Sequence, residues 1–187
     1  MSTASSRVRI LVEIALVVAL AAVLNAIKLW RMPQGGTFSL GMLPLFVLAI
    51  RRGPVVGIAA GALYGVVDFF VDPYPPVHWI QYALDYPVAY AGVGLAGLFS
   101  KHVRGAASSR RRWAVLVTAA VATGAVARYA AHVLSGVVFF SEYAGETPAL
   151  LYSLGYNLYV PVSAAACLAA ALLVLPALPD TEREGEA

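Results

Sequence analysis

Long apolar segments separated by short polar connections dominate this chain. A bilayer core about 30 Å thick takes about 20 apolar residues per helix. Six segments fit a helical membrane protein, namely Arg9–Leu29, Leu40–Ile50, Pro54–Val71, His78–Phe99, Trp113–Phe140 and Ala149–Leu175. The second is too short to cross a bilayer alone, so we expect protein rather than lipid to shield it. The pattern predicts an all-α integral membrane protein with six transmembrane helices.

The composition agrees with lipid as the main solvent. The chain is 60% hydrophobic and only 12% charged, whereas a soluble domain carries about 25% charged residues. We expect one membrane domain over residues 1–179 and an acidic, disordered cytoplasmic tail over residues 180–187. The single cysteine, Cys167, excludes an internal disulfide.

The basic residues predict the orientation in the membrane, because Lys and Arg concentrate in cytoplasmic connections. Ten of the 13 basic residues fall on one side of the predicted spans. They lie before the first helix, in the second-to-third and fourth-to-fifth connections, and in the tail. The sequence therefore predicts a multi-pass cell-membrane protein with both termini cytoplasmic. These residues gather at connections rather than on one polar face, so they do not indicate nucleic-acid binding.

Three polar side chains fall at a similar depth below the outer face. At a rise of 1.5 Å per residue, Asp85, His132 and Asn157 lie about 10, 12 and 13 Å below the outer ends of the fourth, fifth and sixth helices. An ionisable residue costs several kcal/mol in hydrocarbon and is kept where it faces a partner, a cavity or a ligand. With tyrosines nearby, this layer would suit a flat aromatic cation.

Each of these residues also has an ordinary structural explanation. Asp85 could only neutralise Arg128, His132 could be an interhelical histidine, and Asn157 could join helices. Aromatic residues near the outer boundary could form an interfacial belt, which we favour for Trp30 and Trp79. The shared depth favours a binding site over these separate explanations.

Other kinds of site find little support in the sequence. His78, His102 and His132 fall on different loops and helices, so no metal site is expected. The chain has no Gly-Lys-Ser/Thr phosphate-binding loop, so we expect that it does not hydrolyse ATP itself. No catalytic residue and no cofactor are predicted.

Two stripes of small residues suggest close helix packing in lipid. The first helix carries Ala15, Ala19, Ala22 and Ala26, and the third carries Gly57, Gly61 and Gly65. We expect the glycines to pack inside the bundle. The alanines could either pack internally or dock another membrane protein, and the pattern alone does not decide between these.

Several motifs together resemble one transporter family. They are Glu13–Ala19, Ser39–Pro44 with Arg51–Gly53, Gln81–Pro87, Arg128–Tyr129 with His132, and Tyr152–Leu154 with Asn157. The chain resembles, over nearly its whole length, the thiamine-specific substrate-binding subunits (the ThiT family of S-components) of energy-coupling-factor (ECF) vitamin transporters. The resemblance implies an S-component-like six-helix bundle that binds thiamine from outside with high affinity.

The resemblance also implies roles for individual residues. The ligand-binding positions fall on Asp85, Tyr86, His132, Phe140, Tyr152 and Asn157, with Tyr74 in the third loop. Ala15 and Ala19 fall on the motif that docks a transmembrane coupling subunit bearing two ATPases. The first loop would gate the site.

The chain departs from the family pattern at two positions, and two rival functions follow. Asp85 replaces a frequent glutamate and Phe140 a frequent tryptophan, which could alter affinity or ligand orientation. One rival is an S-component for a related pyrimidine or thiazole precursor. The other is an intramembrane enzyme that uses Asp85 and His132 as acid and base.

Overall fold

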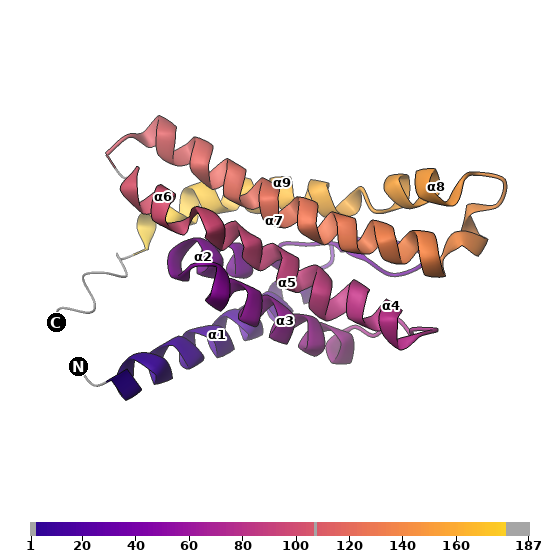
Figure 1. Ribbon diagram of the computed structural model, residues 1–187, viewed down its shortest axis with the longest axis horizontal. Coiled ribbons are helices and arrows are strands. Elements are labelled where there is room, and N and C mark those ends of the chain that lie inside the picture. Colours follow the sequence, from indigo (N-terminus) through magenta and orange to yellow (C-terminus); the bar gives the residue numbers. More distant parts are fainter. Residues whose placement is uncertain (1–2, 107, 179–187) are drawn as a thin grey trace.

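The computed structural model describes residues 3–106 and 108–178, and these residues form one elongated helical bundle (Figure 1). We call the six helical segments that the sequence predicts rods. The first three rods are α1 (Thr3–Ala26), α2 (Met42–Arg52) and α3 (Pro54–Val71). The fourth rod is broken into α4 (Trp79–Ala83), α5 (Ala89–Val93) and α6 (Ser100–Gly105). The fifth is α7 (Arg110–Phe139), and the sixth is split into α8 (Ala149–Tyr156) and α9 (Tyr159–Val174).

Shorter elements complete the described chain. A hairpin of β1 (Trp30–Arg31) and β2 (Thr37–Phe38) connects α1 to α2. A π-helical turn, Leu84–Val88, joins α4 to α5. Three 3-10 turns cover Gly94–Phe99, Ser141–Ala144 and Leu175–Ala177.

The six-helix prediction is confirmed, although the rods are unequal. Within the described residues, four helices are long and apolar enough to cross a membrane alone: Ser5–Ala26, Pro54–Val71, Arg110–Phe139 and Ala149–Ala177. The 11-residue α2 buries seven of its residues, so protein shields it as expected. The start of α1 and the end of α9 lie at the same end of the bundle (Figure 1). That this end is cytoplasmic stays a prediction, and the predicted tail, 180–187, lies outside the described residues.

The glycine stripe of α3 packs inside the bundle, as predicted. A Cβ atom on Gly61 would lie 2.1 Å from the carbonyl oxygen of Tyr90 on α5. A Cβ on Gly65 would lie 2.5 Å from the backbone of Tyr86, and one on Gly57 would lie 2.6 Å from the Cβ of Ala49. These distances are shorter than any van der Waals contact. The stripe therefore lets α3 approach α2 and the fourth rod at backbone distance.

The alanine stripe of α1 behaves differently, because it is divided: Ala22 packs against the core, whereas Ala15 and Ala19 face outward. Ile14, Val18 and Ala21 turn toward the bundle and are buried, while Ala15 and Ala19 are exposed. Internal packing is therefore the wrong explanation for Ala15 and Ala19. Their side of α1 is open to lipid or to another protein.

An ion pair between Glu13 and Arg52 joins α1 to the end of α2. Arg52, at the end of α2, donates from Nε to Glu13 Oε2 at 2.6 Å, and its Nη2 contacts the same carboxylate. Gly53 follows with φ +92°, a conformation that favours glycine, and Pro54 begins α3. The chain thus reverses within one residue while α1 and α2 stay joined.

Candidate functional site

A cavity of about 90 Å³ opens between the hairpin, the C-terminal parts of α3 and α7, the π turn and the α8–α9 junction. This volume holds roughly six water molecules at about 15 Å³ each. All seven residues that the sequence suggests for the ligand line this cavity, namely Tyr74, Asp85, Tyr86, His132, Phe140, Tyr152 and Asn157. Residues from the fourth, fifth and sixth rods and from the loop after α3 therefore meet around one space.

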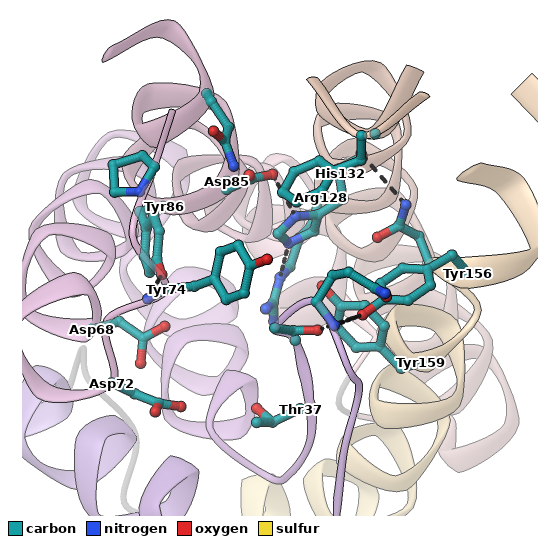
Figure 2. A pocket seen from close by; sticks show the side chains of 18 of the residues that line it. Thr37, Asp68, Asp72, Tyr74, Asp85, Tyr86, Arg128, His132, Tyr156 and Tyr159 are labelled. Carbon is teal, nitrogen blue, oxygen red and sulfur yellow. Dashed lines mark hydrogen bonds and ion pairs between the residues drawn. The ribbon is translucent and has the colours of Figure 1, made fainter. Parts of the chain in front are cut away.

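A hydrogen-bonded chain of three ionisable side chains forms one wall (Figure 2). Arg128 Nε donates to His132 Nε2 at 3.2 Å, and His132 Nδ1 lies 3.2 Å from Asp85 Oδ1. Because Nε2 accepts from an arginine, which is always charged, the proton of a neutral imidazole sits on Nδ1. His132 then donates to Asp85. The imidazole stands between the two charges, so Asp85 does not simply neutralise Arg128.

Arg128 is held from its other side by an aromatic ring. Its side chain is buried, and its guanidinium carbon lies 4.1 Å from the ring centroid of Tyr90. This cation–π contact orients the planar guanidinium toward His132. The sequence suggested Arg128 only as a possible partner of Asp85.

The π turn explains how Asp85 reaches the cavity, and it corrects the prediction of one continuous helix over His78–Phe99. Pro87 has no N–H to donate, and its ring crowds the carbonyl of the residue four positions earlier. The turn Leu84–Val88 widens accordingly, and such π turns are frequent at functional sites. Tyr86, in the same turn, accepts a hydrogen bond from the Tyr74 backbone N–H at 2.9 Å and thereby ties the third loop to this rod.

A second buried carboxylate, Asp68 on α3, lines the same cavity, and sequence reasoning missed it. Its Oδ1 accepts from Asn25 at 2.8 Å and from the Tyr64 hydroxyl at 3.0 Å. Its Oδ2 accepts from the Tyr90 hydroxyl at 3.0 Å. Three donors keep the charge solvated inside protein. Asp68 lies inside the predicted third span, so the signal that drew attention to Asp85 was present here as well.

Asn157 occupies the break in the sixth rod, which the sequence presented as one helix from Ala149 to Leu175. Its amide nitrogen donates to the Ser153 carbonyl at 2.9 Å and to the His132 carbonyl at 3.4 Å. It therefore joins α8 to α7, in keeping with the alternative of an interhelical residue, and it also lines the cavity. The two roles are compatible, because the carboxamide has an oxygen as well as the nitrogen.

The hairpin packs over one side of the cavity. The hydroxyl of Tyr156 accepts from the Gln34 N–H at 2.8 Å and donates to the Gly35 carbonyl at 3.0 Å. Gly36 has φ +82°, and a Cβ there would lie 2.6 Å from the ring of Tyr159. Glycine at the hairpin tip therefore lets the backbone rest directly on α8 and α9.

Charged and aromatic groups surround the mouth. Asp72, just after α3, lies 2.8 Å from Lys28 Nζ and 3.3 Å from Arg31 Nη2. The rings of Tyr74 and Phe140 are 6.0 Å apart. Partial burial and the nearby Tyr143 raise the pKa of Tyr74, so its hydroxyl stays protonated near neutral pH. Within the described residues, no group of three or more His, Cys, Asp or Glu side chains could hold a metal ion.

Comparisons with known proteins agree with this architecture. A family model described as "Thiamine transporter protein (Thia_YuaJ)" matches residues 11–182. The chain belongs to this family. The thiamine transporter ThiT of Bacillus subtilis (strain 168) is 41% identical over 152 residues, which cover 79% of each chain. ThiT of Lacticaseibacillus paracasei is 33% identical over 156 residues, covering 79% of this chain and 77% of that one.

A solved structure extends the similarity to three dimensions. ThiT from Listeria monocytogenes superposes with a TM-score of 0.80 at 32% identity, covering 91% of this chain and 97% of that chain. The protein is thus a multi-pass cell-membrane protein with an S-component-like bundle. Its family is one of transporters, so the alternative of an intramembrane enzyme is wrong.

Proposed function

We propose that the protein binds thiamine from the outer side of the membrane and delivers it inward as the substrate-binding subunit of an ECF-type importer. Membership of the thiamine transporter protein family supports thiamine as the ligand. The observation that carries the proposal is the Arg128–His132–Asp85 chain, which ends on a carboxylate at the wall of an aromatic cavity.

The charges around the inner cavity match a monocation. Among the side chains that line the cavity, Asp68, Asp72 and Asp85 contribute three negative charges and Arg31 and Arg128 two positive charges, while His132 is neutral. The sum is −1, and the thiazolium ring of thiamine carries a permanent charge of +1. A bound thiamine would neutralise the site, whereas an uncharged analogue would leave a buried charge without compensation.

The remaining lining residues supply shape and direction. We assign stacking and cation–π contacts to Tyr74, Tyr86 and Phe140, whose rings border the cavity. Tyr152 and the carboxamide oxygen of Asn157 would hydrogen-bond the aminopyrimidine ring. The hairpin would open to admit the ligand and close behind it.

Transport requires partners that this chain does not supply. We assign Ala15 and Ala19, on the exposed face of α1, to docking a transmembrane coupling subunit, because small residues let helix backbones approach closely in lipid. Two ATPase subunits bound to that partner would provide the energy. The chain alone would bind thiamine without pumping it.

Calorimetry on the purified protein tests the proposal with four probes. Thiamine is compared with thiochrome, which keeps the pyrimidine but has no positive charge, and with the separate pyrimidine and thiazole precursors. We expect tight binding of thiamine and much weaker binding of the other three. A precursor that binds as tightly as thiamine would favour the related S-component instead. Failure of thiamine to bind would contradict the proposal outright.

A further inference from the structure

Asn25, near the C-terminal end of α1, is a buried polar residue that the proposed function leaves unexplained; its side chain is 5% exposed. Its carboxamide oxygen accepts from Thr37 Oγ1 at 3.1 Å and from Ser39 Oγ at 2.6 Å. Its amide nitrogen donates to Asp68 Oδ1 at 2.8 Å. One side chain therefore joins the base of the hairpin to the second carboxylate of the cavity.

The polarity of these bonds makes asparagine specific for this position. The Asp68 carboxylate can only accept, so it orients the amide nitrogen toward itself. The amide oxygen is then turned to the two hydroxyls of Thr37 and Ser39, which must donate. Leucine would lose both sides of the link, and aspartate would set two carboxylates against each other.

The hairpin is thus anchored at two separate places. At its tip, Tyr156 of α8 holds the backbone of Gln34 and Gly35. At its base, Asn25 of α1 holds Thr37 of β2 and the following Ser39. The segment between the anchors covers the cavity, which Asn25 and Thr37 themselves line. Gln34, Gly35 and Gly36 line the cavity as well, so release of either anchor would widen its opening.

We propose that Asn25 is a positioning residue that holds the hairpin closed over the occupied cavity and so determines how slowly thiamine dissociates. The inference rests on the proposed function for the identity of the ligand. Opening the base of the hairpin would separate the two hydroxyls from an acceptor that Asp68 keeps in place. Because the link ends on Asp68, closure of the hairpin depends on the arrangement of the cavity itself.

The test measures the dissociation rate of radiolabelled thiamine from purified variants. Asn25→Leu removes the link. The double variant Thr37→Val with Ser39→Ala removes its hairpin side, together with the bond that Ser39 Oγ accepts from the Gly41 N–H at 3.3 Å. We expect each to speed dissociation on the order of tenfold, the combined effect of two neutral hydrogen bonds of ordinary net strength. Adding Asn25→Leu to the double variant should speed it little further, because all three side chains form one link.

Tyr64→Phe is the matched control. It removes one donor to the same Asp68 carboxylate, and the lost hydrogen bond is to Asp68 rather than to the hairpin. We expect its dissociation rate to stay close to the parental rate. The inference is overturned if Asn25→Leu dissociates at the parental rate, or if Tyr64→Phe dissociates as fast as Asn25→Leu. Should Asn25→Leu fail to fold, the hairpin double variant carries the same test.

Hydrogen exchange without ligand separates this inference from the proposed function. The hairpin amides, residues 30–38, should exchange faster in Asn25→Leu and in the hairpin double variant than in the parent and in Tyr64→Phe. Unchanged exchange in those two variants contradicts the inference even if thiamine binds. A parent that does not bind thiamine contradicts the proposed function, and the exchange data still decide the role of Asn25.

Discussion

Replacing Asp85 by asparagine should weaken thiamine binding strongly while leaving the fold intact. The asparagine oxygen can still accept from His132 Nδ1, so the geometry of the wall persists. What is lost is one negative charge facing a cation. Coulomb's law gives about 3.3 kcal/mol for unit charges about 5 Å apart at an effective dielectric constant of about 20. At about 1.4 kcal/mol per factor of ten, the Kd should rise on the order of 200-fold.

Isothermal titration with thiamine measures this change, and Glu142→Gln is the matched control. Glu142 is an exposed acid in the turn after α7 and does not line the cavity. Glu142→Gln removes one negative charge, as Asp85→Asn does, but changes no residue that lines the cavity. An Asp85→Asn variant whose Kd stays within about fivefold of the parent, the range of an exposed charge pair, would refute the assigned countercharge. Thiochrome, which is uncharged, should bind Asp85→Asn at least as tightly as it binds the parent, because the variant leaves no net charge in the site without compensation.

Three further changes probe packing, docking and stacking. Gly61→Ala should lower the free energy of unfolding by about 3 kcal/mol, because the added Cβ meets the backbone of α5. Gly155→Ala should leave it unchanged, because a Cβ there meets nothing within 4 Å. Denaturant titration of both variants measures the difference. Ala15→Trp should abolish uptake in cells with the coupling subunits but keep thiamine binding, whereas Val126→Trp, on the exposed face of α7, should preserve both. Phe140→Trp should lower the Kd for thiamine about threefold through a stronger cation–π contact. Calorimetry measures this Kd, and an unchanged or higher value would contradict the prediction.

The sequence located much of the candidate site because depth along a helix is simple arithmetic. Counting residues inward from three helix ends set Asp85, His132 and Asn157 at one level, and the structure brings them to one cavity. The breaks in the fourth and sixth rods did not disturb the count, since Asp85 is the second residue of the π turn and Asn157 directly follows α8. The gathering of these residues is therefore a property of the chain, and their part in binding thiamine stays a prediction.

What the sequence did not yield depends on contacts between distant segments. Asn25 reads as an ordinary polar residue near a helix end until the hairpin folds back onto it. Asp68 was overlooked although it lies among valines and phenylalanines, where a carboxylate needs partners. Tyr64 precedes it by one turn of α3, but Asn25 and Tyr90 come from α1 and α5, and no spacing in the sequence connects these two to Asp68. The two-residue strands of the hairpin are likewise too short to carry a pattern.

The π turn at Leu84–Val88 lets the two halves of the fourth rod satisfy different neighbours. An α-helix rotates about 100° per residue, so one residue taken up in a wider turn shifts the rotational phase of everything that follows. Asp85, near the start of the turn, lies at the cavity, and Gly94, beyond the turn, lies against the backbone of α3. Deleting a single residue from this turn would rotate one half out of phase with its neighbour, so an engineered variant could keep the recognition face or the glycine contact, but not both.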